Sequence, residues 1–532
     1  MMPAGVKLPP LTLQGHATAL GGNYSARLTA RTGAGRLALN GSLRGSAPAY
    51  SIDLRADSFP VGSFMPDMGI GAVSATVRAS GRSLNPLQRG AQLNAAVNVG
   101  SLQLRGDRIT DLRADATLAD GALTAAISSG APAADFNLDL DAALQPKTVG
   151  WKLRGNVRNL DLKALGLTDS ILTGRMALRS EGFAALNLDT VSADATLLDA
   201  RLQMNSMKLA LDSLTMTARA GSQIAVDLGN RTLNAAFRAD TTLNALTADF
   251  VRAAGAATEM IDRRDFLADS LISLLPPMNL TLNARPGSVL EQFVEPSGIK
   301  FRTLDLSART DTALHAHTRL LGLASGESLA IDTLTLRLLS RGHALLLDAD
   351  IDNRPGTLDE FAHVCLRGGI SGRTGRFFIE QQNLRGVVGY RLGLRASVAD
   401  SVITVNFDPT EPTIAYKQWT INADNFLSFN PSTFHIDANL DARGAGSRLQ
   451  LLSSESSAPT DSLTPNNVAL KVSDVHIQDW LQLNPFAPPI AGDVNADLTV
   501  NYSTKSDTFV PISELIYKDK YHMNHEGRQI KN

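Results

Sequence analysis

The sequence predicts an all-β protein built as an elongated, mostly antiparallel sheet, with a few short helices and one longer helix near residues 249–275. Apolar residues recur at every second position in many segments, which is the pattern of a strand with one buried face. Turn residues (Gly, Asn, Asp and Pro) separate these segments about every 8–12 residues. Antiparallel pairing is favoured, because strands of a parallel sheet covered on both faces read as continuous apolar runs.

Composition narrows the function classes. Of 532 residues, 44% are hydrophobic and 19% are charged, so the chain buries apolar surface and is not a disordered or highly charged chain. With 50 basic and 52 acidic residues there is no basic excess to neutralise phosphate backbones, and nucleic acid is not an expected partner. The single cysteine, Cys365, excludes a disulfide framework within the chain, so stability must come from packing and backbone pairing.

The strands alternate most clearly at residues 493–502, where one face is apolar and the other polar. Residues 136–142 and 436–442 repeat this pattern, and shorter examples lie at 304–308, 334–338 and 392–398. A loose module also recurs, in which a short helical turn rich in Leu or Phe separates two alternating strands. It fits residues 53–81, 152–182, 280–310 and 470–502, whose irregular spacing argues against a fixed-period solenoid.

Helical spacing is strongest from 249 to 275, where Phe250, Ala254, Ala257 and Ile261 begin an apolar stripe that we expect to pack against the sheet. Pro276 and the proline after it end this helix. Capping boxes predict two further helix starts, at Ser288 with Glu291 and at Thr357 with Glu360.

Catalytic and metal-binding patterns are weak throughout. The nearest approach to a GxSxG nucleophile turn, at residues 322–326, has Ser325 one place late. His315 and His317 would share a strand face, but no third ligand follows in a suitable spacing, so we interpret them as polar residues on the wet face. The paired acids belong to polar strand faces in the same way. We therefore expect no enzymatic activity, no metal and no cofactor.

The predicted organisation is a β region at 1–248, a helical insertion at 249–296, a second β region at 297–502 and an unlike tail at 503–532. No run reaches the roughly 18 apolar residues of a membrane helix, and the first residues lack the pattern of a signal peptide. The change of character after Ser503 leads us to expect a fragment of a longer protein.

Several segments carry a resemblance to a known family. Residues 153–167 followed by 172–178 resemble repeats of the AsmA-like superfamily, in particular those of the translocation and assembly module subunits of the Bacteroidetes type. Residues 412–426 and 484–494 are similar to the same repeats, and the likeness is spread over the chain to about Tyr502. The family's N-terminal membrane helix and its C-terminal domain have no counterpart in this sequence, which agrees with an internal fragment.

The resemblance implies a sheet curled into a taco-like groove, apolar inside and polar outside, that bridges the inner and outer membranes from the periplasm. It implies phospholipid transfer between these membranes and support of outer-membrane protein assembly or secretion. Phospholipid acyl chains would be the ligand, and an assembly-type barrel protein of the outer membrane would be the partner, met through the missing C-terminal region. The groove-lining residues expected on this basis are Leu304, Leu306, Leu334, Leu336, Leu338, Leu392, Leu394, Ile436, Leu440, Val494, Leu498 and Val500.

Two other functions stay open at this point. A cell-surface adhesin made of β-sandwich repeats would show regular domain-sized periods and linkers. A carbohydrate-active parallel β-helix would show stacked clusters of charged residues and more aromatic platforms than the 5% aromatic content provides. Both fit a β-rich chain less economically than a lipid conduit does.

Overall fold

The computed structural model describes residues 10–45, 48–64, 70–104, 107–165, 167–325, 329–355, 361–453, 467–481 and 492–501, with short pieces at 524–525 and 528–529. It confirms the predicted fold class: the chain is almost entirely β, its ladders are antiparallel, and hydrogen bonds assign 33 strands to one sheet. The chain forms two compact units. The first unit covers residues up to 245 together with 287–297, and the second covers 246–286 and the residues from 298 onward.

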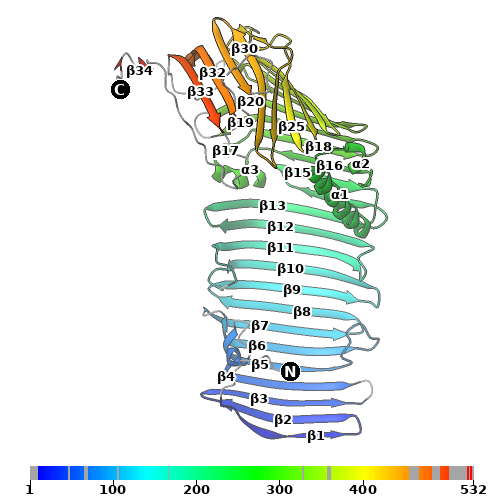
Figure 1. Cartoon of the computed structure of the whole chain (residues 1–532). Helices are drawn as coiled ribbons and strands as arrows, with labels where there is room; N and C mark the ends of the chain where they lie inside the picture. Colours follow the sequence, from blue (N-terminus) through cyan, green and yellow to red (C-terminus); the bar gives the residue numbers. More distant parts are fainter. Residues whose placement is uncertain are drawn as a thin grey trace. The chain divides into compact units, whose positions relative to one another are not determined.

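The first unit is a meander in which each strand pairs with the next along the chain (Figure 1). Its elements are β1 (Thr12–Leu20), β2 (Asn23–Thr32), β3 (Gly35–Arg44), β4 (Ala49–Pro60), η1 (Val61–Ser63), β5 (Ile70–Arg82), β6 (Gln92–Leu104), β7 (Asp107–Ala119), β8 (Ala122–Ala131), β9 (Ala134–Leu144), β10 (Thr148–Asp161), β11 (Leu172–Ala185), β12 (Val191–Met204), β13 (Met207–Ala220), β14 (Ile224–Gly229), β15 (Leu233–Ala239), α3 (Val289–Val294) and η3 (Glu295–Ser297).

The second unit continues the antiparallel pattern with more irregular connections. Its strands are β16 (Met278–Ala284), β17 (Ile299–Lys300), β18 (Thr303–Thr310), β19 (Leu314–Ser325), β20 (Leu329–Arg341), β21 (Ala344–Asp352), β22 (His363–Ser371), β23 (Thr374–Gln382), β24 (Val388–Ala399), β25 (Val402–Phe407), β26 (Thr413–Ile414), β27 (Lys417–Gln418), β28 (Thr420–Ile421), β29 (Phe426–Asn430), β30 (His435–Gly444), β31 (Ser447–Ser453), β32 (Asn467–His476) and β33 (Asp493–Asn501). Its helices are α1 (Leu243–Arg263), which begins at the end of the first unit, α2 (Ala268–Ile272) and α4 (Ile477–Leu481). Strands β34 (Asn524–His525) and β35 (Arg528–Gln529) pair with each other.

A row of bulges crosses the first unit. The register shifts in the β4–β5, β5–β6, β9–β10, β10–β11 and β11–β12 ladders, and following the register places these shifts on one line. Asp111 in β7 and Asp199 in β12 lie on the same line with positive φ angles of 57° and 46°. Because a bulge bends its strand and increases its twist, the row gives the sheet a common bend parallel to one edge.

Fully buried apolar side chains of the first unit lie near the two edges of its sheet, beside turns and helical caps. At one corner Phe59 and Phe64 stack with ring centroids 5.3 Å apart, over buried Ala30 and Ala56. The remaining buried side chains near the edges include Leu118, Ala131, Ala134, Leu165, Ala200, Met207 and Leu211. The centre of the apolar face is only half-buried, so the described residues of this unit do not form the covered core of a two-layer domain.

The predicted module is confirmed, because a helical turn separates the two strands at each of its four places. The turns are η1 after β4, residues 162–165 after β10, α3 after β16 and α4 after β32. The predicted helix start at Ser288 is also present: its hydroxyl accepts from the Glu291 N–H at 3.3 Å, and the Glu291 carboxylate accepts from the N–H of Gly287, one residue before the N-cap, at 2.6 Å. The capping box at Thr357 and Glu360 lies outside the described residues.

The side-chain amide of Gln292 pairs with the backbone of β13 as a neighbouring strand would, and so holds helix α3 against β13. The Gln292 carbonyl accepts from the Ala210 N–H at 2.6 Å, and its Nε2 donates to the Ala210 carbonyl at 2.9 Å. Because both backbone groups of Ala210 are paired in this way, the short helix has a fixed position at the edge of the sheet.

The single helix expected at 249–275 is wrong in its bounds. Helix α1 ends at Arg263 in a Schellman turn: Arg264 has a φ of 52°, its N–H donates to the Ile261 carbonyl at 3.1 Å, and the Asp265 N–H donates to Met260 at 3.0 Å. The next residue, Phe266, is extended because it forms a β-bridge to Gly372. This tertiary pairing separates α1 from α2.

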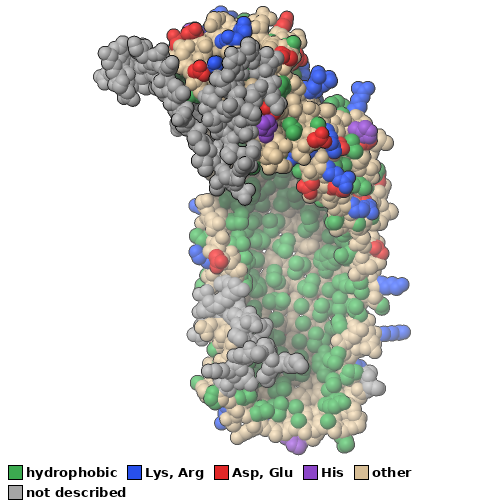
Figure 2. Space-filling model, viewed as in Figure 1, with side chains coloured by type: hydrophobic (Ala, Val, Ile, Leu, Met, Phe, Trp, Pro, Cys, Tyr) green, Lys and Arg blue, Asp and Glu red, His purple; other side chains and the backbone are tan. Residues whose placement is uncertain are grey.

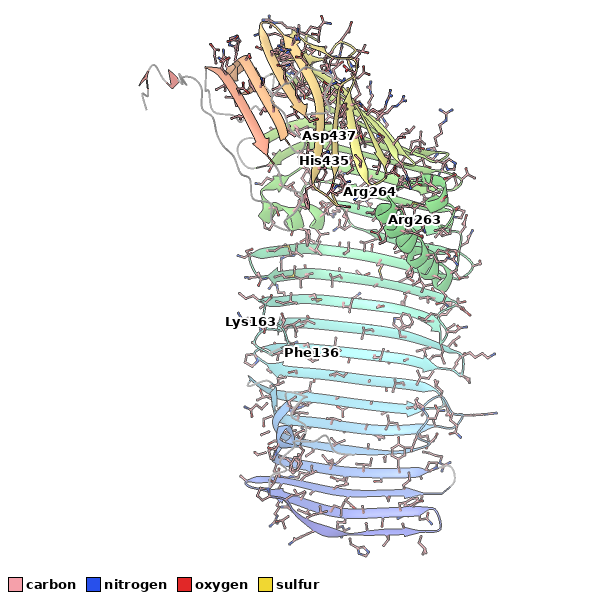
Figure 3. All side chains as sticks on the ribbon, in the orientation of Figure 1. Phe136, Lys163, Arg263, Arg264, His435 and Asp437 are labelled. Atoms are coloured by element: carbon pink, nitrogen blue, oxygen red, sulfur yellow. The ribbon has the colours of Figure 1, made fainter. Side chains whose placement is uncertain are left out.

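The orientation expected for the apolar stripe is also wrong. Phe250 is 44% exposed and Ile261 is 72% exposed, whereas Leu246 and Ala253 are buried. The chain leaves α1 through Arg264 (Figure 3), whose guanidinium donates to the Ser401 carbonyl at 3.0 Å. In the described part of the chain, every helix is too short or too polar to span a membrane.

Two-residue hairpin turns set the register between many strands. Between β7 and β8, Asp120 and Gly121 have φ angles of 51° and 79°, as a type I′ turn requires. A Cβ on Gly121 would also lie 2.6 Å from the Leu144 carbonyl oxygen.

We expect Gly121→Ala to destabilise the first unit by about 1–3 kcal/mol, because alanine is strained at this φ angle and collides with Leu144. Asp120→Asn is the matched control, since Asn-Gly is equally suited to this turn. Thermal unfolding of both variants tests this, and equal melting temperatures for Gly121→Ala and the wild type would show that the turn does not control the register.

Candidate functional site

One face of the first unit carries an unbroken apolar row across successive strands. Each residue of this central row lies directly opposite the next in the ladder, so all point to the same face. From β2 to β13 the row reads Leu28, Leu39, Leu54, Val77, Val97, Ala114, Ile127, Leu138, Gly155, Leu178, Leu197 and Leu214.

A second row, displaced by two residues, runs beside the first on the same face. It reads Ala17, Ala26, Gly41, Ile52, Ala79, Ala95, Ala116, Ala125, Leu140, Leu153, Ser180, Ala195 and Met216. The hydroxyl of Ser180 is occupied, since it accepts from Trp151 Nε1 at 3.1 Å. We call these two rows the groove floor.

The floor is open. Ile52 and Ile127, which lie within it, expose 40% and 38% of their surface, and Met216, on its last strand β13, exposes 37%. Figure 2 shows hydrophobic side chains gathered over this face of the first unit, which is hollowed between two raised margins. The two rows are therefore the bottom of a groove with no second layer of this unit packed on it among the described residues.

Aromatic rings in this groove lie over glycines of the neighbouring strand. A Cβ on Gly81 would lie 2.6 Å from Tyr50 Oη, and one on Gly182 would lie 2.8 Å from Trp151 Cζ2. Because these glycines have no side chain, the rings can cover the backbone. Phe136 belongs to the same face on β9, whereas Lys163 lies at the edge in the turn after β10 (Figure 3).

The opposite face of the first unit is polar along its whole length. Thr18 and Ser25 share a hydrogen bond of 2.6 Å across β1 and β2, and Thr117 and Thr124 share one of 2.5 Å across β7 and β8. On the same face, Nη2 of Arg219 in β13 lies 2.7 Å from a carboxylate oxygen of Asp194 in β12. This face is suited to water, and the groove floor is not.

In the second unit, the residues predicted to line a groove all fall on one face. Leu304 and Leu334 both lie opposite Leu320, and Leu336 connects through Ala349, Leu366 and Ile379 to Leu392. The register brings the remaining positions to the same face, namely Leu306, Leu338, Leu394, Ile436, Leu440, Val494, Leu498 and Val500. Those with described side chains are half-buried, and Val500 is placed by its backbone pairing alone. That they contact a ligand stays a prediction.

The sequence analysis missed the groove floor of the first unit. The second of its rows is built largely from Ala, which carries a weak hydrophobic signal, and the leucine-rich strands after residue 300 were favoured instead. The sequence signal that could have identified the floor is the alternation of apolar and polar residues, for example at residues 136–142, combined with the regular spacing of the turns.

His315 and His317 lie exposed on the polar face of β19, as expected of residues on a wet face. Across the residues that the structure describes, no group of three or more His, Cys, Asp or Glu side chains could hold a metal ion. Cys365 is buried, and burial raises the pKa of its thiol.

The polar face of the second unit contains a tight charge cluster at Asp441. Its carboxylate accepts from Arg448 Nη2 at 2.7 Å and from Arg443 Nη2 at 2.6 Å, and these guanidiniums, Arg448 first, hold the pKa of Asp441 far below its ordinary value. The pKa of Asp441 is lower in the folded protein than in the unfolded chain. Its charge therefore stabilises the folded protein at pH values above the unfolded pKa of about 4, and this stabilisation is lost as the pH falls through the folded pKa.

We expect Asp441→Asn to destabilise the second unit by about 1 kcal/mol at neutral pH and to reduce its sensitivity to acid. Fluorescence of Trp419, which is 4% exposed, reports this during acid titration. Asp139→Asn, an exposed change on the polar face of β9, is the control. An unchanged acid transition in Asp441→Asn would contradict this assignment.

Comparison with known proteins gives no identification: the chain matches no protein-family model, no curated protein and no solved structure.

Proposed function

We propose that this protein is a lipid-conducting scaffold whose apolar groove holds the acyl chains of phospholipids while their headgroups stay in water at its margins. The observation that carries the proposal is the groove floor, an apolar face shared by consecutive strands of the first unit and not covered by other described residues of that unit. At about 4.8 Å per strand, a floor from β1 to β13 extends roughly 60 Å. That length exceeds one acyl chain and suits a path along which several lipids pass.

Energetics explain why such a face needs no catalytic residue. Each CH₂ moved from water to an apolar surface is worth about 0.8 kcal/mol, so a two-chain lipid faces a barrier on the order of 20 kcal/mol in bare water. A groove that covers the chains along the whole path lowers this barrier continuously. The polar opposite face keeps the scaffold itself in water.

The groove is also hard to explain as ordinary surface. Proteins in water rarely expose contiguous apolar patches larger than a few hundred Å², and larger patches mark binding sites. Ile52, Ile127 and Met216 belong to two parallel rows, not to scattered positions. An apolar ligand that binds along the sheet would remove this surface from water.

The wider setting follows from the resemblance to the AsmA-like superfamily. We place the chain in the periplasm of a cell envelope, where it carries phospholipid between inner and outer membranes and supports outer-membrane protein assembly or secretion. An assembly-type barrel protein is the proposed partner. A parallel β-helix enzyme is disfavoured because the ladders are antiparallel, and no observation favours an adhesin.

The first test uses strand parity in the first unit. A photo-crosslinking residue at Leu140, on the floor, should capture phospholipid in membrane-containing cells, whereas the same residue at Asp139, on the wet face of β9, should capture at least about tenfold less. Lipid analysis of the adducts measures this ratio. Equal capture at the two positions would exclude the floor as the lipid path.

The second test uses the second unit. Leu336 shares the apolar face and Thr335 the opposite face, so Leu336→Asp should enter the lipid path and Thr335→Asp should not. With an open groove both variants stay folded, because the new charge reaches water, and only Leu336→Asp loses bound lipid. If Leu336→Asp unfolds the protein while Thr335→Asp does not, this face is a dry core and not a groove.

A further inference from the structure

Two arginines face each other across β23 and β24 on the polar face of the second unit. Arg376 lies directly opposite Arg395, and like charges in this position destabilise a sheet. Both side chains are exposed. Within the described residues neither has a carboxylate at ion-pair distance, and Asp408 acts on Arg395 only from farther away, so no carboxylate bridges the pair.

The same unit contains a compensated pair for comparison. Arg443 and Arg448 are also directly opposite each other, across β30 and β31. There the Asp441 carboxylate lies between them, 2.6 Å from one guanidinium and 2.7 Å from the other. A single anion therefore bridges this arginine pair, and the Arg376–Arg395 pair lacks such a group.

The uncompensated pair lines a hollow of about 900 Å³. The polar face of this hollow also presents Arg367, Ser371, Asn406 and Asp408. Three arginines therefore face one carboxylate. Oδ1 of Asp408 accepts from the Thr410 N–H at 2.9 Å, and the side chain lies over Gly393 of β24, two residues from Arg395.

The net charge of the side chains that line this hollow is therefore positive. The Thr410 N–H is the main cause of a lowered pKa at Asp408, and the positive charge of Arg395 adds to it, so Asp408 is ionised at neutral pH. Arg367 is shared with Asp348 and Asp350 at 3.6 and 3.7 Å, which leaves Arg376 and Arg395 as the two guanidiniums available to a ligand. Guanidiniums bind phosphate oxygens in a bidentate geometry.

We propose that Arg376 and Arg395, on the polar face of the second unit, form a phosphate-binding site. The ligand takes the place that Asp441 occupies in the other arginine pair. A phosphate or phosphomonoester dianion matches the two positive charges and offers several oxygens to the two guanidinium forks. The site would recognise either free phosphate or a phosphate carried by a lipid headgroup.

The test is binding of inorganic phosphate to the purified chain, followed by ³¹P line broadening in low salt. Arg376→Gln with Arg395→Gln should weaken binding by at least about tenfold, since charge-assisted hydrogen bonds from both guanidiniums are lost. The control variant is Arg154→Gln with Arg179→Gln, another directly opposed arginine pair, on the polar face of the first unit, where Asp139 of β9 lies opposite Arg154 and supplies a negative charge beside the pair. It should leave phosphate binding unchanged.

Vesicles identify the source of the phosphate. Flotation is compared for phosphatidylcholine vesicles with and without phosphatidic acid, whose headgroup is a phosphomonoester. Binding of inorganic phosphate or of phosphatidic acid vesicles that depends on Arg376 and Arg395 supports the site. The proposal is overturned if the wild type binds neither probe, or if both double variants weaken binding equally. Lipid capture in the groove is measured separately and does not depend on this outcome.

Discussion

The strict alternation of side chains along a strand is the constraint on which the rest of the structure depends. Because the period is two, a slip of one residue in any ladder would move every apolar side chain of that strand to the wet face. Two-residue turns such as Asp120-Gly121 and Gly21-Gly22 fix each register locally, with positive φ angles that only a few residues tolerate. The groove floor exists because these local registers agree from one strand to the next.

A sheet of this kind is stabilised differently from a two-layer domain. Each strand contacts mainly its two neighbours, so stability is approximately a sum over adjacent ladders. Buried side chains gather at the edges, where η1 and α3 cover the sheet, and the centre of the apolar face is left free. The row of bulges bends this face. The bend, together with η1 and α3 at the margins, gives the sheet the form of a groove.

Much of this could be predicted from the sequence, because strand alternation and turn chemistry are local. The strands, the helical turns of the module and the Ser288 cap follow from such signals, and so does the common face of Leu304, Leu336 and Leu392. The break between α1 and α2 could not be predicted, since it depends on Phe266 meeting Gly372 in a distant hairpin.

The two proposed binding surfaces also could not be predicted from the sequence alone. One row of the first unit's floor joins mostly Ala positions, whose hydrophobic signal is weak one strand at a time and strong only when the ladder aligns them. The opposition of Arg376 and Arg395 is likewise invisible until the β23–β24 register is known. A single sequence reports which face of a strand is apolar, but not which residues of other strands complete a row.

The central claim is that the apolar face is a lipid path, and mass spectrometry of the purified protein tests it most directly. The protein is isolated from membrane-containing cells without detergent, and everything extracted by organic solvent is identified without preselection. The account predicts two-chain phospholipids in at least stoichiometric amount, lost when Ile127, in the middle of the floor, is replaced by Asp and kept when its wet-face neighbour Ala126 is replaced in the same way. A folded protein that carries no lipid, or that carries equal lipid in both variants, would contradict it.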